Sequence, residues 1–107
     1  MQKRIYLLST LLPVLGFVFA PPALSAEADL VKAEKVYKRS CATCHGKQGE
    51  KPAMGESKII NQLKPEEIST ALSERKAGNI TGAGSPAKQR LSEQDIHNLS
   101  EYIQTLK

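Results

Sequence analysis

The sequence predicts an all-α protein with three to four helices. Three segments of this 107-residue chain carry apolar residues at helical spacing. Clusters of glycine and proline separate the segments and interrupt any regular element between them. The predicted helices span residues 28–39, 65–78 and 92–106.

The first predicted helix covers residues 28–39. Its apolar positions approximate one stripe with polar residues between them. These positions are Val31, Ala33, Val36 and Tyr37. The stripe predicts that one face of this helix packs against another element.

The middle helix is predicted from its two ends. Pro65 suits the first helical position, and Glu66 and Glu67 favour the positive end of the helix dipole. Gly78 can end the helix. The predicted apolar face consists of Ile68, Ala71 and Leu72. On either side, residues 44–58 and 79–86 are rich in Gly and Pro and are predicted to be a loop and a mobile connection.

The last helix has the clearest start signal. Ser92 can cap it, Asp95 stands at the third helical position as in a capping box, and Leu91 can pack on Ile96. Its apolar residues recur at spacings of three, four and three. They are Ile96, Leu99, Ile103 and Leu106. This stripe predicts that the helix covers another surface.

Residues 1–26 are predicted to be a signal peptide. Lys3 and Arg4 form a basic start, residues 5–20 are mostly apolar, and small residues follow. Cleavage after Ser25 fits the small-residue rule, with the exact bond open by one residue. We therefore expect a periplasmic location.

A retained membrane anchor is the alternative to cleavage. Pro13 and Gly16 interrupt the apolar stretch, which is short for the hydrocarbon core of a bilayer. No cysteine stands at the cleavage point, so lipidation is not indicated. Residues 27–107 remain as one small domain without stable membrane insertion.

The charge balance does not indicate a nucleic-acid partner. The chain has 15 Lys and Arg against 11 Asp and Glu, a net charge of +4. Signal cleavage removes Lys3 and Arg4 and lowers this charge further. The remaining excess is too small to predict binding to a polyanion.

The most specific motif is Cys41-Ala42-Thr43-Cys44-His45. A Cys-x-x-Cys-His run is the attachment motif of a c-type haem: the two thiols form thioethers with the vinyl groups, and the histidine ligates the iron. Residues 27–107 contain no Phe or Trp, so a small domain would need the porphyrin as part of its core. One motif predicts one haem c, bound by Cys41, Cys44 and His45.

Three other uses of the cysteines are weaker alternatives. A thioredoxin-like redox pair should follow a buried strand, but no β-branched run precedes Cys41. A zinc site needs four ligands, and His97 is the only other histidine. A disulfide between Cys41 and Cys44 would close a strained ring.

The chain from residue 28 to residue 107 resembles the class I c-type cytochromes, especially the small monohaem bacterial ones. The resemblance rests on Cys-Ala-Thr-Cys-His-Gly at 41–46, Pro-Ala-Met-Gly at 52–55, Leu-Ser-Glu-Gln-Asp-Ile at 91–96, and on Ala33, Tyr37 and Tyr102. It implies the class I cytochrome c fold, in which the first and last helices cross. The crossing contacts would be Ala33, Tyr37, Leu99 and Tyr102.

The resemblance also implies a role for Pro52. Its carbonyl would accept a hydrogen bond from the ring N–H of His45 and so fix the orientation of this ligand. Such an outer contact also strengthens the histidine as a ligand. Pro52 is therefore a candidate for the second shell of the iron.

The chain departs from this family at the sixth iron ligand. Typical members place a methionine some residues before the Leu-Ser start of the last helix, whereas this chain has Gly84, Ser85 and Pro86 there. Met54 is the only methionine besides Met1, and it matches the family's haem-packing leucine. It is expected to be a core residue, with distal ligation of the iron as an alternative.

Other side chains are weaker candidates for the sixth ligand. His97 lies off the apolar stripe and is expected to be solvated. Lys76, Asn79 and Lys88 flank the segment that should cover the distal face. The favoured interpretation is a sixth position that is empty, water-filled or loosely occupied, which could bind a diatomic gas.

Two classes of function follow. The first is an electron carrier, not an enzyme, that acts as a monomer between dehydrogenase-type donors and a terminal oxidase or reductase. Lys47, Lys51 and Lys58 would help to orient acidic partners, or serve solubility alone. The second is a gas sensor, a scavenger or a peroxide-reactive protein, with His97 as the acid-base group to test. A small haem subunit of a larger oxidoreductase is a further alternative.

Overall fold

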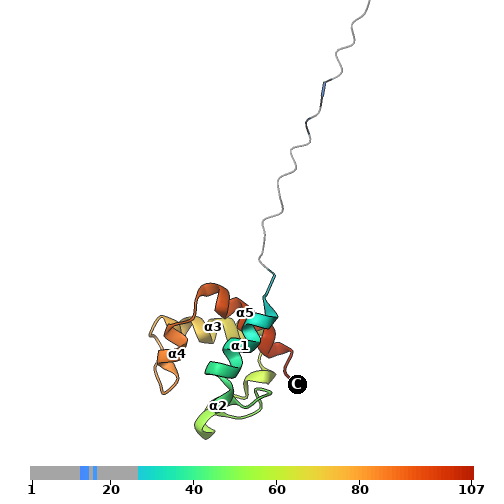
Figure 1. The fold of residues 1–107 in the computed structure, drawn as a ribbon. Coiled ribbons are helices and arrows are strands. Elements are labelled where there is room, and N and C mark those ends of the chain that lie inside the picture. Colours follow the sequence, from blue (N-terminus) through green and yellow to red (C-terminus); the bar gives the residue numbers. More distant parts are fainter. Residues whose placement is uncertain (1–12, 15, 17–26) are drawn as a thin grey trace, which may run out of the picture.

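Helices form every regular element in the part of the chain that the computed structural model describes, residues 13, 14, 16 and 27–107. Three helices are long, as predicted, and two are short. In chain order with two 3-10 turns, the elements are α1 (Leu30–Ser40), α2 (Ala42–His45), η1 (Ala53–Gly55), η2 (Ile60–Gln62), α3 (Pro65–Lys76), α4 (Ser85–Gln89) and α5 (Glu93–Gln104) (Figure 1). The all-α prediction is confirmed.

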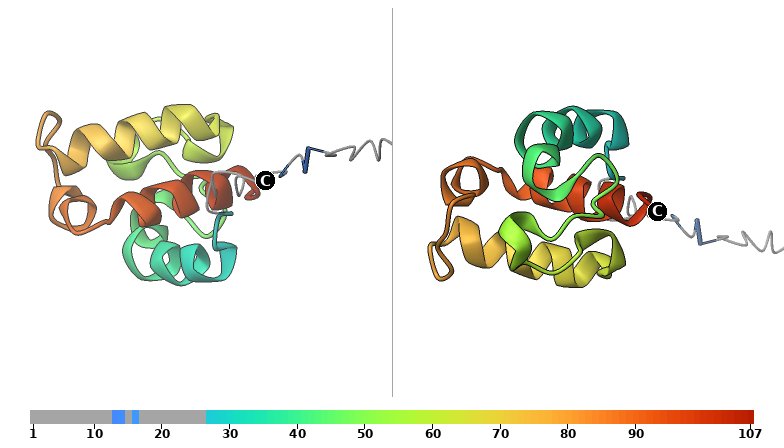
Figure 2. Two further views of the ribbon diagram at one scale, coloured as in Figure 1. Left: turned by 90° about the horizontal axis from the view of Figure 1, so that it is seen from above. Right: turned by 90° about the horizontal axis from the view of Figure 1, so that it is seen from below.

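The last helix is the centre of the fold. Both views in Figure 2 show α5 between α1 and α3, and it packs against each of them. All four residues of its predicted apolar stripe are buried. The core consists of Ala33, Val36, Tyr37, Ile68, Leu72, Leu91, Ile96, Leu99, Ile103 and Leu106.

The predicted start of α5 is confirmed at atomic detail. The Ser92 hydroxyl accepts a hydrogen bond from the Asp95 backbone N–H at 3.0 Å, and the Asp95 carboxylate accepts one from the Ser92 N–H at 3.0 Å. These two bonds satisfy N–H groups that the helix itself leaves without partners. Leu91 and Ile96 both lie in the core, as the predicted contact between them requires.

The packing of α1 on α5 includes a buried polar contact that holds the start of α1. Asn98 is 1% exposed, and its side-chain oxygen accepts hydrogen bonds from the Asp29 N–H at 2.9 Å and from Gln94 at 2.8 Å. The Asp29 carboxylate in turn caps α1 by accepting from the Lys32 N–H. The predicted contact residues Ala33 and Tyr37 are buried in this interface, but Val31 is 66% exposed, and its assignment to the buried stripe was wrong.

Two segments predicted as irregular contain short helices. Residues 44–58 begin inside α2, and the predicted connection at 79–86 runs into α4. Pro86 explains the second difference, because proline favours the first turn of a helix. The helix α3 begins at Pro65 and is followed by Gly78 with φ +84°, as predicted.

The predicted signal peptide lies almost wholly outside the described residues, as does its cleavage site. In the part of the chain that is described, no helix has the length and apolar character needed to cross a membrane. The alternative of a retained membrane anchor concerns the same N-terminal residues, so it stays a prediction from the sequence.

Candidate haem site

A single helical turn brings the three motif side chains together. The helix α1 ends with the Cys41 N–H donating to the Tyr37 carbonyl at 2.8 Å. The Cys41 carbonyl then accepts from the N–H groups of Cys44 at 3.2 Å and His45 at 3.0 Å. Residues three and four positions apart lie on the same face of a helix. We call residues 41–45 the attachment turn, because it presents two sulfurs and one imidazole on one face.

The two thiols of this turn are free and differ in exposure. Cys41 is half-buried and Cys44 is exposed, and they form no disulfide. Burial raises the pKa of the Cys41 thiol, and the nearby Lys88 ammonium opposes this shift. The raised pKa keeps the Cys41 sulfur as a thiol, the form in which c-type haem is attached.

The imidazole of His45 is held in its neutral form. Burial lowers the pKa of His45, and the positive charges of Lys88 and Arg75 lower it further. A neutral imidazole has a lone pair that can ligate a metal. The ring Nδ1 is buried without a hydrogen-bond partner among the described residues, so the polypeptide leaves this nitrogen unsatisfied.

A buried tyrosine fixes the backbone directly after His45. The Tyr37 hydroxyl donates to the Gly46 carbonyl at 2.6 Å, and the side chain is fully buried. Burial, followed by the charges of Cys41 and Glu50, raises the pKa of Tyr37 to about 12. The ring also lies 5.6 Å from that of Tyr102, centroid to centroid. This contact ties the attachment turn to the predicted interface between α1 and α5.

The loop after the attachment turn folds back onto it. Gly46 has φ +85° and ψ 162°, and the Glu50 carboxylate occupies the place where a side chain on Gly46 would begin. Such backbone angles are accessible essentially to glycine alone. The Lys51 N–H donates to the His45 carbonyl at 2.9 Å, and Asn61 donates from its side chain to the Gln48 carbonyl at 2.9 Å. These two hydrogen bonds hold the loop after the attachment turn against His45.

Two predicted features of this loop, a hydrogen bond from His45 to Pro52 and a core position for Met54, are not seen in the polypeptide alone. The Pro52 carbonyl accepts from the Gly55 N–H at 3.0 Å, within the tight turn at η1, and makes no hydrogen bond with the buried Nδ1 of His45. Met54 was expected in the core, but the polypeptide leaves 79% of it exposed. It has φ +54°, because it lies in the same tight turn. Met54 lies in η1, which contacts α2, the helix that contains His45.

Of the lysine and asparagine candidates, only Lys88 lies near the attachment turn without a partner. Lys76 donates to the Leu91 carbonyl, and the Asn79 amide donates to Glu74 at 2.9 Å. Lys88 is half-buried, and its charge affects the pKa values of both Cys41 and His45. Burial and the neighbouring Arg75 lower the pKa of Lys88 itself.

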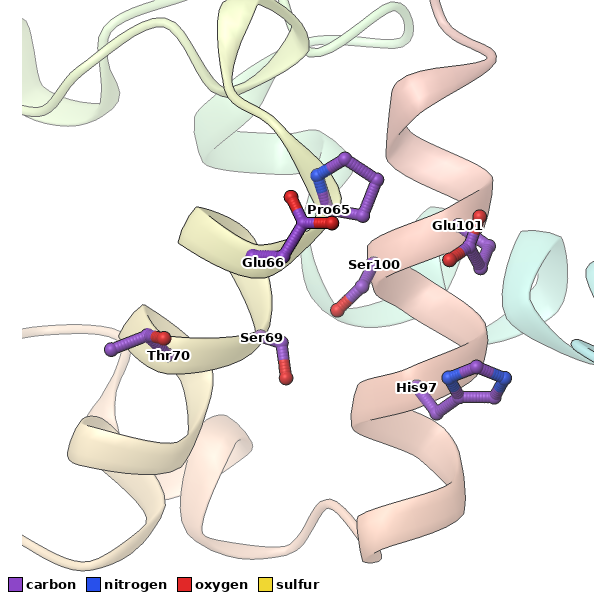
Figure 3. A pocket seen from close by; sticks show the side chains of 7 residues that line it. All are labelled: Pro65, Glu66, Ser69, Thr70, His97, Ser100 and Glu101. Carbon is purple, nitrogen blue, oxygen red and sulfur yellow. The ribbon is translucent and has the colours of Figure 1, made fainter. Parts of the chain in front are cut away.

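The structure places His97 elsewhere. Its side chain is exposed and lines a groove of about 310 Å³ between α3 and α5 (Figure 3). The other lining residues are Pro65, Glu66, Ser69, Thr70, Ser100 and Glu101. A second groove with His97 in its wall is also formed without any residue of the attachment turn. His97 therefore does not join Cys41, Cys44 and His45.

The donor set fits a covalently bound haem and does not fit the alternatives. Two free thiols and a neutral imidazole share one face, and the buried Nδ1 of the imidazole has no hydrogen-bond partner in the described part of the chain. Among the described residues, no three His, Cys, Asp or Glu side chains are grouped as a metal site would require. No strand precedes Cys41 in residues 27–40, as a thioredoxin-like motif would need.

Two residues that shape the site were not found from the sequence. Glu50 covers Gly46, and Arg75 acts on His45 from α3. A glycine followed by an acid four residues later is too common to indicate such a contact. Arg75 stands in the last turn of a helix, where a basic residue is also expected for the helix dipole.

Comparison with known proteins agrees with this geometry. The family model described as Cytochrome c matches residues 30–107. The chain is 41% identical over 83 residues to cytochrome c-553 of Helicobacter pylori (strain ATCC 700392 / 26695), covering 77% of this chain and 86% of the relative. It is 36% identical over 91 residues to cytochrome c-554(547) of Halothiobacillus neapolitanus, covering 74% of this chain and 98% of the relative.

The match of the family model includes the attachment turn and all five α-helices. The expected resemblance to small class I cytochromes is confirmed by these relatives, and with it the expected cofactor, one covalently attached haem c. The chain thus belongs to the cytochrome c family and is a monohaem c-type cytochrome that carries electrons.

Proposed function

We propose that this protein is a periplasmic carrier of single electrons in which Cys41 and Cys44 hold the haem and His45 is the proximal iron ligand. The observation that carries the proposal is the attachment turn, where one carbonyl accepts from both Cys44 and His45 and so aligns all three side chains. Each thiol adds across one vinyl group: a carbon–sulfur bond forms, and the thiol proton moves to the neighbouring vinyl carbon. No oxidant is needed for this step.

The surrounding contacts suit electron transfer, because they keep His45 in one position. The bound haem supplies an iron that alternates between the ferric and ferrous states. The hydrogen bonds from Tyr37 to Gly46 and from Lys51 to His45 hold the backbone on both sides of the ligand. A ligand that does not move when the charge changes keeps the cost of electron transfer low.

We further propose a reduction potential below that of relatives with histidine and methionine ligands. A methionine thioether favours the ferrous state and raises the potential. Residues 84–86 of this chain are Gly, Ser and Pro. Met54, the remaining methionine of residues 27–107, lies in η1, which contacts the helix α2 that contains His45.

The proposed partners are dehydrogenase-type donors and a terminal oxidase or reductase. Lys47, Lys51 and Lys58 are exposed around the attachment turn and its loop, where they can orient acidic partner surfaces. Orientation by exposed charges raises association rates and weakens with salt. The protein would meet these partners as a monomer after cleavage of residues 1–26.

Expression in a host with a c-type haem attachment system tests this proposal. We expect a purified protein whose mass includes one haem and whose redox titration fits a reversible one-electron process. The expected N-terminus begins at residue 26 or 27, which intact mass also reports. Replacement of Cys41, Cys44 or His45 should abolish a stable holoprotein. A wild-type protein that acquires no covalent haem, or a haem that cannot be cycled reversibly, would contradict the proposal.

A further inference from the structure

The side of the site formed by α4 contains an unusual arrangement of a glycine and a lysine. Lys88 lies one helical turn after Gly84, and its N–H donates to the Gly84 carbonyl at 3.3 Å. The Lys88 Nζ lies where a side chain on Gly84 would begin. Because Gly84 has no side chain, the lysine can fold back over it. The ammonium therefore lies over residue 84 and not out in solvent.

The Lys88 ammonium lies within electrostatic reach of the attachment turn. Its positive charge affects Cys41 and His45, and Cys41 and Cys44 act on Lys88 in return. Coulomb interactions weaken with distance and solvent, so such mutual effects require charges that are near one another. Among the described lysines, Lys88 is the only one whose charge affects both Cys41 and His45.

Lys88 also has no partner for its charge in the described part of the chain. Its half-buried ammonium makes no hydrogen bond or ion pair with the described residues, whereas Lys76 donates to Leu91, and Lys32 and Lys38 pair with acids. A buried charge without a partner is unfavourable unless the group becomes neutral or finds a ligand. Burial and the Arg75 guanidinium lower the pKa of Lys88, which favours the neutral amine.

The position of this amine matches the departure from the family described above. The segment that should supply a methionine begins at Gly84, and the Lys88 Nζ takes the space over that residue. A neutral lysine amine is a nitrogen donor with a lone pair, as an imidazole is. The chain therefore offers an alternative ligand where the thioether is missing.

We propose that the Lys88 amine is the second axial ligand of the haem iron. The assignment rests on the proposed haem function and extends it. On binding, Lys88 releases one proton to solvent, its nitrogen lone pair forms the bond to iron, and a bound water leaves. No electron is transferred in this step.

A charge contact with the haem propionates is the competing role for Lys88. The two roles separate in a Lys88→Arg variant. Arginine keeps the positive charge and the reach needed to contact a propionate, but it stays protonated and does not give a lone pair to iron. Lys76→Arg is the matched control, because Lys76 is also half-buried and already donates to a backbone carbonyl.

The test is the electronic absorption and electron paramagnetic resonance of the ferric holoproteins. We expect the wild type and Lys76→Arg to be low-spin without a methionine–iron charge-transfer band, and Lys88→Arg to lose the low-spin signal. In the ferrous state, Lys88→Arg should bind carbon monoxide faster than the other two. A low-spin Lys88→Arg protein with the wild-type spectrum would overturn the assignment.

A second measurement uses the wild type alone, in case Lys88→Arg gives no holoprotein. Nuclear magnetic resonance of the ferrous, lysine-labelled protein should show one lysine whose methylene protons are strongly shifted by the porphyrin ring current, and sequential assignment should identify it as Lys88. Ordinary shifts for every lysine would overturn the assignment while leaving a working haem protein. A wild type without covalent haem would overturn the proposed function and this assignment together.

Discussion

The two sides of the candidate haem site are built differently. On the His45 side, residues 41–55 are held by a dense set of hydrogen bonds from Tyr37, Lys51 and Asn61. On the α4 side, Gly84 precedes the five-residue helix α4, which contains the half-buried Lys88, and two hydrogen bonds between Gly82 and Ser85 hold the turn before the helix. The comparison teaches that haem attachment depends on many local contacts, whereas the sixth ligand depends on one side chain.

Removal of both thiols should have the largest effect. Cys41→Ser with Cys44→Ser removes both covalent bonds, and residues 27–107 are too small and too poor in aromatics to form a stable core alone. We expect loss of covalent haem by intact mass and loss of the tertiary circular dichroism signal. Lys88→Arg should keep the covalent haem. A folded, haem-containing double variant would contradict this difference between the two sides.

Alanine substitutions at glycines should have the next largest effect, and the loss of stability should differ between the two sides of the site. Gly46→Ala forces a side chain onto glycine-only backbone angles and against Glu50, and we expect a loss of about 3 kcal/mol of holoprotein stability in guanidinium unfolding. Gly78→Ala, with φ +84° and open space around it, measures the backbone cost alone.

Gly84→Ala is the counterpart on the α4 side. It has an ordinary φ of −87°, and its new side chain meets only the flexible end of Lys88. We expect little loss of stability but a changed ferric spectrum, because Lys88 must move. Equal losses of stability in Gly46→Ala and Gly84→Ala would contradict the proposed difference between the His45 side and the α4 side.

Loss of the buried hydroxyl should be the next largest effect. Tyr37→Phe leaves the Gly46 carbonyl without its donor, and we expect a loss of about 2 kcal/mol in guanidinium unfolding of the holoprotein. Tyr102→Phe, which keeps the bond between Tyr37 and Gly46, should cost less. If the two variants are equally stable, the hydrogen bond from Tyr37 to Gly46 does not stabilise the holoprotein as proposed.

The same hydroxyl predicts a pH dependence. Burial raises the pKa of Tyr37 from 10.0 to about 12, so the unfolded chain releases this proton at lower pH than the folded protein. The stabilisation is complete below pH 10.0 and is lost as the pH rises through about 12. The unfolding free energy of the wild type should fall more steeply over this window than that of Tyr37→Phe. Parallel curves would show that Tyr37 does not titrate this way.

Substitution of His97 should have the smallest effect. His97 lines grooves that contain no residue of the attachment turn. His97→Gln should therefore leave the absorption spectrum and the reduction potential unchanged. A changed spin state in this variant would place a second histidine in the site.

Local signals in the sequence were enough to predict most of the helical frame. The capping box at Ser92 and Asp95 and the stripe from Ile96 to Leu106 lie within α5 and its ends, and the structure contains both. Ala33, Tyr37 and Leu99 were also predicted as contacts, because the resemblance to class I cytochromes identified them.

Features that depend on tertiary contacts could not be predicted in this way. Val31 fits a helical stripe but is exposed, and the Pro52 carbonyl is engaged in its own turn. The approach of the Lys88 Nζ to Gly84 depends on the conformation of the Lys88 side chain, which the order of residues alone does not fix. Spacing along the chain suggested Lys88 only as one of several candidates.

The most direct test of the account is the visible spectrum of the purified holoprotein in both oxidation states, with carbon monoxide added to the reduced form. It reports the spin state of the iron and the access of an external ligand together. The account predicts a low-spin protein without the methionine–iron band, whose ferrous form carbon monoxide does not change at once. A high-spin ferrous protein that binds carbon monoxide immediately would contradict it and favour gas binding over electron transfer.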